Sequence, residues 1–442
     1  MPRQTGHLAL PTLQRPRWRR LSALALPCAL ALAAGCGTAE PVRPPAPLPS
    51  YDECVEKYKS GCYTPTQVLR AYGLDRLHAQ GMDGRGTTIA IVIPAANPYV
   101  QKSMDDFSDQ FDLPRTRIEV INRGAPPLTP DDPVANLAAH EATTDLQIAH
   151  AAAPKAKLLY VQVGFDHLAG IGEVMKAIDW LTRQRRVDVI SMSLGASEPS
   201  VLQLAGGRAR FDELRQPLIA ANRTGTTLLA STGDTGSGGH DLTGDQRRRA
   251  VAWPASDPLV TAVGGSRLHL DAQGQRTGPD EVWGSPSPLT TQKGATGAGT
   301  STLFPRPAHQ DHAAALLGQH RGVPDLLANA APESAVWIHT THSQGKPIVK
   351  PARGTSIAAP LVAGIVAIAA QQASRPLGDI GPALHRHADR PQDAGLADIT
   401  QGCNHTATIQ GHCAAPGYDL VSGLGALNDA AQFVQALTTE AP

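Results

Sequence analysis

The sequence has 442 residues, of which 41% are hydrophobic and 4% aromatic, and its 39 basic and 39 acidic side chains give a formal net charge of zero. A chain of this length can bury a large core, in two or three domains or in one large α/β domain. The balanced charge gives no indication of a nucleic-acid partner, so we expect none. The 42 glycines and 37 prolines predict many turns and long loops.

The first 35 residues have the pattern of a signal peptide. Four arginines between positions 15 and 20 precede an apolar run over 21–34, which is short for a membrane span but suits a signal-peptide core. The run ends in LAAGC, which resembles the lipobox of bacterial lipoproteins. We therefore expect export, cleavage before Cys36 and lipidation of its thiol, which would attach the protein to the cell envelope. Ordinary cleavage with secretion is the alternative, and the mass of the mature N-terminus distinguishes the two.

A Pro-rich segment follows the leader. Residues 37–50 (GTAEPVRPPAPLPS) are typical of an extended tether, which we assign to 36–62, with one globular domain over 63–435. The four cysteines beyond Cys36 form two close pairs, Cys54 with Cys62 and Cys403 with Cys413. Two local disulfides are the simplest of three connectivities. Zinc is the competing interpretation, but none of these spacings is CxxC.

From residue 64 the chain alternates between strand and helix patterns. Apolar runs typical of strands buried on both faces occupy 88–93, 157–163, 187–194 and 226–231. Helical patterns lie near 136–151, 170–184 and 208–223. This alternation predicts an α/β fold, with a mostly parallel sheet covered by helices on both faces. Residues 277–310 hold many Gly, Pro, Ser and Thr, and we expect them to form long surface loops.

Segment 354–360 (GTSIAAP), followed by an apolar run, predicts a helix that begins near Ser356 and accommodates Pro360 in its first turn. At a helix N-terminus, free N–H groups and the positive end of the dipole stabilise a developing negative charge. A serine placed there can attack a carbonyl. A serine that only caps a buried helix has the same pattern.

Two carboxylates lie in the helical pattern near 136–151. Glu141 and Asp145 are four residues apart, so they share one face of the helix. Neighbouring carboxyls can share one proton, which raises the pKa of one of them and gives a general base that works in acid. A solvated helix face is the alternative. The zinc motif HExxH is excluded because Thr144 stands where its second histidine would be.

Two further acidic sites follow along the chain. Asp234, in STGDTG, comes directly after the strand predicted at 226–231, where parallel sheets bind ligands in the crevice at their carboxyl ends. An ordinary turn aspartate is the alternative. Near the C-terminus, Asp398 and Asp419 with nearby turn carbonyls are oxygen ligands suited to Ca²⁺, although Asp and Gly in loops more often make turns.

Taken together and in this order, these segments resemble the sedolisins, the serine-carboxyl peptidases with a subtilisin-like fold. The resemblance covers nearly all of 64–428. It includes the blocks YTPTQ at 63–67, AYG at 71–73, VISMSLG at 189–195, WPASDP at 253–258, TAVGG at 261–265 and RGVPD at 321–325. It implies a single large subtilisin-like catalytic domain, monomeric, that hydrolyses peptide bonds in proteins at acidic pH.

The resemblance also implies a role for each site residue. Ser356 would be the nucleophile that forms an acyl-enzyme, Glu141 its general base, and Asp145 a partner that orients Glu141 and shares its proton. Protonated Asp234 and the Ser356 N–H would donate hydrogen bonds to the oxyanion. One structural Ca²⁺ ion would be held by the family's ligand positions, namely the carboxylates of Asp398 and Asp419 and the backbone carbonyls of Ile399, Ala415 and Gly417.

Three features depart from the family pattern. Sedolisins are usually made with a long N-terminal pro-domain, for which the segment between Cys36 and residue 63 leaves no room. Arg353 stands where the family commonly has glycine, and Ala196 interrupts a usual Gly-Gly pair. Both residues are expected near the substrate cleft, where they could alter specificity or weaken the enzyme.

Two other functions remain as alternatives. A neutral Ser–His–Asp peptidase would use His140 or His150 as its base, but residues 91–94 (IVIP) lack the aspartate that subtilisins place after their first strand. No His-Gly-Thr block follows either. The alternative outside enzymes is a catalytically weak or inactive lipid-anchored binding protein of the same fold.

Overall fold

The computed structural model describes residues 47–439 except 185–186, 244–247, 285–293 and 342–344. The predicted signal peptide, Cys36 and most of the predicted tether lie outside the described residues. The end of that tether is corrected, because helix α1 (Tyr51–Tyr58) occupies it. Ser50 and Glu53 form a capping box, in which the Glu53 carboxylate accepts from the Ser50 N–H at 2.7 Å. Regular structure therefore begins before residue 63.

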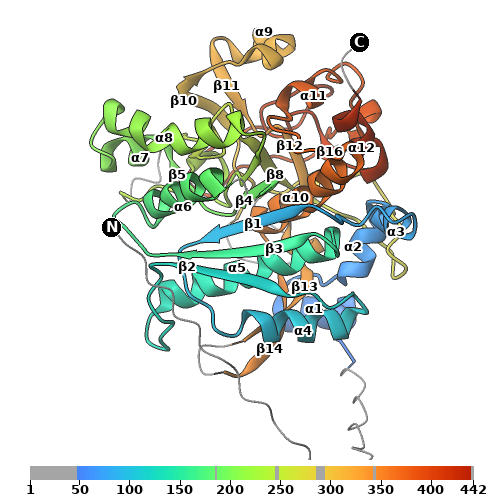
Figure 1. Ribbon diagram of the computed structural model, residues 1–442. Coiled ribbons are helices and arrows are strands. Elements are labelled where there is room, and N and C mark those ends of the chain that lie inside the picture. Colours follow the sequence, from blue (N-terminus) through green and yellow to red (C-terminus); the bar gives the residue numbers. More distant parts are fainter. Residues whose placement is uncertain (1–46, 185–186, 244–247, 285–293, 342–344, 440–442) are drawn as a thin grey trace, which may run out of the picture. The chain divides into compact units, whose positions relative to one another are not determined.

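A ten-stranded sheet runs through the described part of the chain, and most of its strands are parallel (Figure 1). Its order is β15-β16-β12-β8-β6-β4-β1-β3-β2, with β9 paired to β8. Only the β15–β16 and β8–β9 pairs of this sheet are antiparallel. The strands are β1 (Thr88–Ile93), β2 (Ile118–Arg123), β3 (Lys157–Val163), β4 (Val189–Met192), β6 (Thr227–Ser231), β8 (Thr261–Arg267), β9 (Glu281–Val282), β12 (Leu326–Asn329), β15 (Leu396–Ala397) and β16 (Ala426–Leu427).

Helices cover both faces of this sheet, as the sequence predicts. On one face α5 (Pro133–Ala152) packs against α10 (Thr355–Ala373), and on the other α6 (Ile171–Gln184) packs against α8 (Arg208–Arg223). Strand β1 shows why two cores form. Its isoleucines at 89, 91 and 93 belong to the core beneath α5 and α10, whereas Ala90 and Val92 belong to the core beneath α6.

The other helices and strands surround this centre. They are α2 (Pro65–Ala71), α3 (Leu74–Ala79), α4 (Val100–Phe111), α7 (Glu198–Leu204), α9 (Ala314–Leu317), α11 (Gly381–His385), α12 (Ala430–Thr438), β5 (Ala196–Ser197), β7 (Ala252–Trp253), β10 (Gly299–Pro305), β11 (His320–Val323), β13 (Val336–Thr341) and β14 (Pro347–Ala352). Both predicted local disulfides are present, Cys54–Cys62 and Cys403–Cys413, so these four sulfurs are not free to bind zinc.

The loop prediction for 277–310 is only partly right. Strand β10 lies inside it and pairs with β11, and the side chains of Ala295, Thr296 and Ala298 are buried. Small residues here permit close backbone packing rather than exposure. A Cβ on Gly297 would lie 2.0 Å from the Thr232 carbonyl oxygen, so only glycine fits beside the end of β6.

Helix α10 begins at Thr355 with Gly354 as its N-cap, so Ser356 is its second residue. The placement of Pro360 in the first turn is wrong, because this proline stands inside the helix. It cannot donate the N–H that would reach the Ser356 carbonyl four residues earlier. Packing compensates, since every residue from 357 to 370 is buried. Among the described helices, α10 alone is long and apolar enough to cross a membrane, and it is a core helix.

Candidate active site

Two adjacent carboxyls on α5 face the start of α10. Glu141 and Asp145 lie one helical turn apart, as their spacing predicts, and α5 packs along α10. Asp145 is fully buried, and Glu141 interacts with both Asp145 and the Ser356 side chain. Among the described residues, no lysine or arginine forms an ion pair with either carboxyl. The pair therefore has no cation to balance two negative charges.

Burial raises the pKa values of both carboxyls of this pair, which favours their protonated forms. It raises the pKa of Glu141 to about 7, and the nearby charge of Asp234 acts in the same direction. Burial also raises the pKa of Asp145 well above its usual range, and the charge of Glu141 adds to that effect. Glu141 Oε1 and both carboxyl oxygens of Asp145 are buried without a hydrogen bond of normal geometry. One shared proton relieves this cost, because a neutral carboxyl tolerates burial better than a charged one.

The third carboxyl, Asp234, is anchored to the first residue of α10. The N–H and the hydroxyl of Thr355 donate to Asp234 Oδ1 at 2.9 and 2.8 Å, and the same hydroxyl accepts from the Gly233 N–H at 3.1 Å. Asp234 Oδ2 faces Gly354, where a Cβ would lie only 2.5 Å away. Gly354 also has a φ of 113°, so both its conformation and this approach require glycine.

Burial raises the pKa of Asp234, whereas the two Thr355 hydrogen bonds and the charge of Arg353 lower it. Since Thr355 holds Asp234 and the next residue, Ser356, meets Glu141, the start of α10 lies between the two acidic sites. The partly exposed Ser356 stands in the first turn of α10, at the positive end of the helix dipole. The structure thus brings together all four residues that the sequence singled out at this site.

Two neighbours of the site were not assigned roles from the sequence. Thr355 fixes Asp234, and Ser193, which follows β4, interacts with the Asp145 carboxyl and lowers its pKa. Both lie inside motifs that had been noticed, GTS and VISMSLG. Their roles depend on partners more than 40 positions away, which local patterns do not reveal.

Neither histidine of the alternative mechanism meets Ser356. His150 lies further along α5, and its Nε2 is 2.7 Å from the Pro114 carbonyl oxygen. His140 is next to Glu141 in sequence but lines a separate cavity with Leu137 and Lys350. Burial lowers the pKa of His140 to about 3 and that of His150 to about 4. Carboxyls, not imidazoles, therefore surround the serine.

The two departures from the family pattern have different surroundings. Arg353 is partly buried, which lowers the pKa of its guanidinium, whereas the nearby charges of Asp234 and Glu333 raise it. It makes no hydrogen bond or ion pair with any described residue. It therefore lies beside the site, as expected. Ala196 is fully buried, and its backbone pairs with Trp253 across β5 and β7. Its side chain is therefore in the core, and its place near the substrate cleft stays a prediction.

Four of the five predicted calcium ligands, Asp398, Ala415, Gly417 and Asp419, lie in one turn or contact it. The Gly417 N–H donates to Asp398 Oδ2 and the Ala415 N–H donates to Asp419 Oδ2, each at 2.9 Å. The N–H groups of Val421 and Ser422 also donate to Asp419 Oδ1, which fixes this carboxylate in the loop. Ala415 is not among the described residues with positive φ, so alanine fits where the family has glycine.

The raised pKa of Glu141 predicts a stability effect with a definite sign. Because this pKa is higher in the folded chain, the group's favourable contribution is complete below pH about 4.5 and is lost as the pH rises through about 7. Replacing Glu141 with Gln should therefore raise the free energy of unfolding by about 1–3 kcal/mol at pH about 8 and change it little at pH about 4. Thermal melts at both pH values measure this, with the exposed Glu56→Gln as control. An equal effect at both pH values would contradict the burial of an ionisable Glu141.

The family described as "Subtilase family" matches residues 133–383, which contain Glu141, Asp145, Asp234 and Ser356. Kumamolisin of Bacillus sp. (strain MN-32) is 30% identical over 371 residues, covering 82% of this chain and 61% of that protein. Tripeptidyl-peptidase 1 of Bos taurus is 30% identical over 234 residues, covering 48% and 37%, and that of Homo sapiens is 28% identical over 265 residues, covering 54% and 41%. The chain thus spans less than two thirds of these relatives.

The fold is also that of a known structure. Pseudomonas sedolisin, described as a serine-carboxyl proteinase in complex with two molecules of pseudo-iodotyrostatin, superposes with a TM-score of 0.71. The match covers 85% of this chain and 98% of the other, at 23% sequence identity. At this identity the comparison establishes the shared architecture, and the chemistry must be argued from the residues themselves.

Proposed function

The chain belongs to the subtilase family and, within it, to the sedolisins; from that premise we propose that it is a serine-carboxyl endopeptidase, active on proteins at acidic pH. One observation carries the proposal above the others. The serine at the start of α10 meets a buried carboxyl pair, whose pKa values are raised, and no imidazole. Such a pair can accept a proton in acid, where histidine is already charged.

In the proposed reaction the Ser356 hydroxyl attacks the peptide carbonyl and Glu141 accepts its proton. Asp145 shares a proton with Glu141 and keeps its carboxylate oriented. Glu141 then donates the acquired proton to the leaving amine, and the acyl-enzyme is hydrolysed when water repeats the steps in reverse. In each half-reaction the pair passes on the proton that it accepts, first to the leaving amine and then to Ser356, so it regains its starting protonation state without any further acid or base.

Asp234 stabilises the oxyanion in this proposal, together with the Ser356 N–H. Its Oδ1 already accepts two hydrogen bonds from Thr355, so a proton is better held on Oδ2, which faces the Gly354 backbone. A protonated Oδ2 can donate a hydrogen bond to the oxyanion, whereas an ionised one would repel it. Arg353 opposes this because its charge favours ionised Asp234.

The pH dependence of kcat/KM on a denatured protein substrate tests the proposal. We expect activity to fall as the pH rises toward about 7, because Asp234 and the Glu141–Asp145 pair lose the protons that the reaction requires. Activity should also fall in strong acid, when the pair takes up a second proton and Glu141 can no longer act as a base. Arg353→Gly should extend the activity to higher pH. If kcat/KM rises only at pH values above the pKa of histidine, the carboxyl mechanism is wrong.

We propose in addition that the turn around 415–419 binds one Ca²⁺ ion. The donor set is all oxygen, as Ca²⁺ prefers: two carboxylates, Asp398 and Asp419, and the carbonyls of Ile399, Ala415 and Gly417. The hydrogen bonds to Gly417 and Ala415 support it, because both carboxylates already reach the same turn. The ion would join the segment after β15 to this loop and hold the C-terminal part of the domain.

Removing calcium should therefore destabilise the protein. Free Ca²⁺ at 100 times its Kd stabilises a folded chain by about 2.7 kcal/mol, so a calcium chelator should lower the Tm measurably. Asp398→Asn should melt at the lower temperature with or without calcium, whereas the exposed Asp393→Asn should behave like the unchanged chain. An identical Tm in calcium and in chelator would remove the ion from the proposal.

A further inference from the structure

Three histidines gather at the edge of the sheet opposite the candidate active site. Asp325 stands just before β12 and accepts from the Ala262 N–H near the start of β8, so it marks the amino ends of these parallel strands. Asp234 follows β6 and marks the carboxyl ends. The cluster around Asp325 consists of His309, His312 and His385. It is therefore separate from the proposed catalytic residues.

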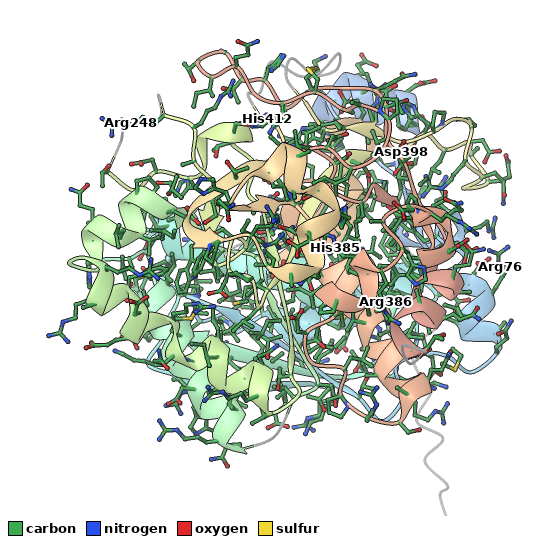
Figure 2. The ribbon with its side chains drawn as sticks, turned by 90° about the horizontal axis from the view of Figure 1, so that it is seen from above. Arg76, Arg248, His385, Arg386, Asp398 and His412 are labelled. Atoms are coloured by element: carbon green, nitrogen blue, oxygen red, sulfur yellow. A yellow bond between two sulfur atoms is a disulfide. The ribbon has the colours of Figure 1, made fainter. Side chains whose placement is uncertain are left out.

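The backbone explains how the imidazoles meet. His309 and His312 lie on the 3₁₀ helix η2 (Ala308–Ala313), where side chains three residues apart fall on the same side. Their rings lie 4.9 and 5.2 Å from the ring of His385, the last residue of α11. Figure 2 labels His385 at the boundary between the segment that contains η2 and the helices near the C-terminus.

The hydrogen bonds around His385 fix the orientation of its ring. Asp325 forms a buried double ion pair with Arg321, with distances of 2.8 and 2.6 Å, and Arg321 together with His385 holds the pKa of Asp325 well below its usual range despite burial. A carboxylate only accepts, so His385 Nε2, at 3.1 Å from Asp325 Oδ1, must carry the hydrogen. In the neutral imidazole His385 Nδ1 then has the free lone pair, and it shares one hydrogen with His312 Nε2 at 2.8 Å.

This is the arrangement of a metal-binding histidine, whose second nitrogen is oriented by a carboxylate. Two nitrogens bound tetrahedrally to Zn²⁺ at about 2.0–2.1 Å lie about 3.3 Å apart, so an ion could replace the proton between His312 and His385 after a shift of about 0.5 Å. His309 is close enough to be a third imidazole ligand, because its ring centroid lies 4.9 Å from that of His385 and its ligand atom lies within 4.8 Å of those of His385 and Asp325. That set includes Asp325 rather than His312, so His309 would turn toward His312 to reach the ion. A cavity of about 720 Å³, lined by His309, His385, Asp379 and Arg386 among others, gives access from solvent.

We propose that His309, His312 and His385 bind one divalent transition-metal ion of the Zn²⁺ class, and that the ion joins η2 to α11. Imidazole ligands favour Zn²⁺, Co²⁺ or Ni²⁺ over Ca²⁺, so this site differs from the all-oxygen turn at 415–419. Asp325 is a positioning residue, which orients His385 and is itself held by Arg321.

Cobalt titration of the whole chain tests the site. Metal-free protein in excess Ca²⁺ at pH about 7 should take up one Co²⁺ with the visible absorption of a tetrahedral site, and Zn²⁺ should displace it. His312→Ala and His309→Ala should each weaken binding at least tenfold. The exposed His320→Ala, on the neighbouring β11, is the matched control and should bind like the unchanged chain. His312 is exposed, so its removal should leave the fold intact, which a thermal melt checks.

Several results would overturn the proposal. The absence of saturable Co²⁺ uptake would do so, as would equal affinity in the unchanged chain and in both His309→Ala and His312→Ala. Loss of binding in His405→Ala alone would place the ion beside Cys403 and Cys413, where His405 Nε2 lies 3.6 Å from the Cys413 sulfur. The test uses no peptidase assay, so it stands independently of the proposed catalytic function.

Discussion

Ser356→Ala is expected to lower kcat/KM for denatured protein at pH about 4 by roughly 10⁴-fold or more, because Ser356 carries the hydroxyl that meets Glu141. The residual rate would come from substrate binding and from the oxyanion donors, which remain in place. The fold should not change, since the side chain is small and partly exposed. Cleavage assays with thermal melts measure both effects. Ser374→Ala, at the exposed far end of the same helix, is the matched control and should retain full activity.

Two results would contradict this expectation. Equal cleavage by Ser356→Ala and the unchanged chain would remove Ser356 from the mechanism. No cleavage by the unchanged chain would instead favour an inactive binding protein of the same fold. Arg353 offers a physical reason for such an outcome, because its charge opposes the protonation of Asp234. Restored cleavage in Arg353→Gly would then identify this arginine as the cause.

The predicted fold class and family are confirmed, and the residues show why the sequence was sufficient. Runs such as TIAIVI and KLLYVQV are buried on both faces, so their boundaries coincide with β1 and β3. The i,i+4 spacing of Glu141 and Asp145 fixes a shared helix face wherever α5 lies. That this face meets Ser356 depends on the packing of α5 against α10, which local periodicity does not encode and only the family resemblance implied.

Features that depend on contacts between residues distant in the chain were not predicted from the sequence. The glycines and alanines near residue 297 looked like a surface loop, but they permit a backbone contact with Thr232. The burial of Ala196, whose backbone pairs with Trp253 between β5 and β7, had no sign in the local sequence. The histidine cluster joins positions 309 and 385, and its same-side geometry arises from a 3₁₀ turn that no pattern predicted. In each case the deciding partner is distant in the chain.

Glu141→Gln is expected to have two opposite effects. It should lower kcat/KM by about 10⁴-fold, because the amide cannot accept the Ser356 proton, while it stabilises the fold at neutral pH. A residue that only supported the structure would lose stability when replaced, so this combination indicates a carboxyl kept in an unfavourable environment for its chemistry. Kinetics and melts on the same preparation measure both.

His140→Ala is the decisive control for that variant, since it changes the preceding residue of the same helix, which is one of the two histidines of the alternative mechanism. It should keep activity within a few-fold and leave the acidic pH profile unchanged. The opposite pair of results, with Glu141→Gln active and His140→Ala inactive, would assign the base to histidine.

Asp145→Asn distinguishes the role of Asp145 from that of Glu141. An amide at that position cannot share a proton with Glu141, so the base remains but its pKa changes, and the acid limb of the profile should move while some activity persists.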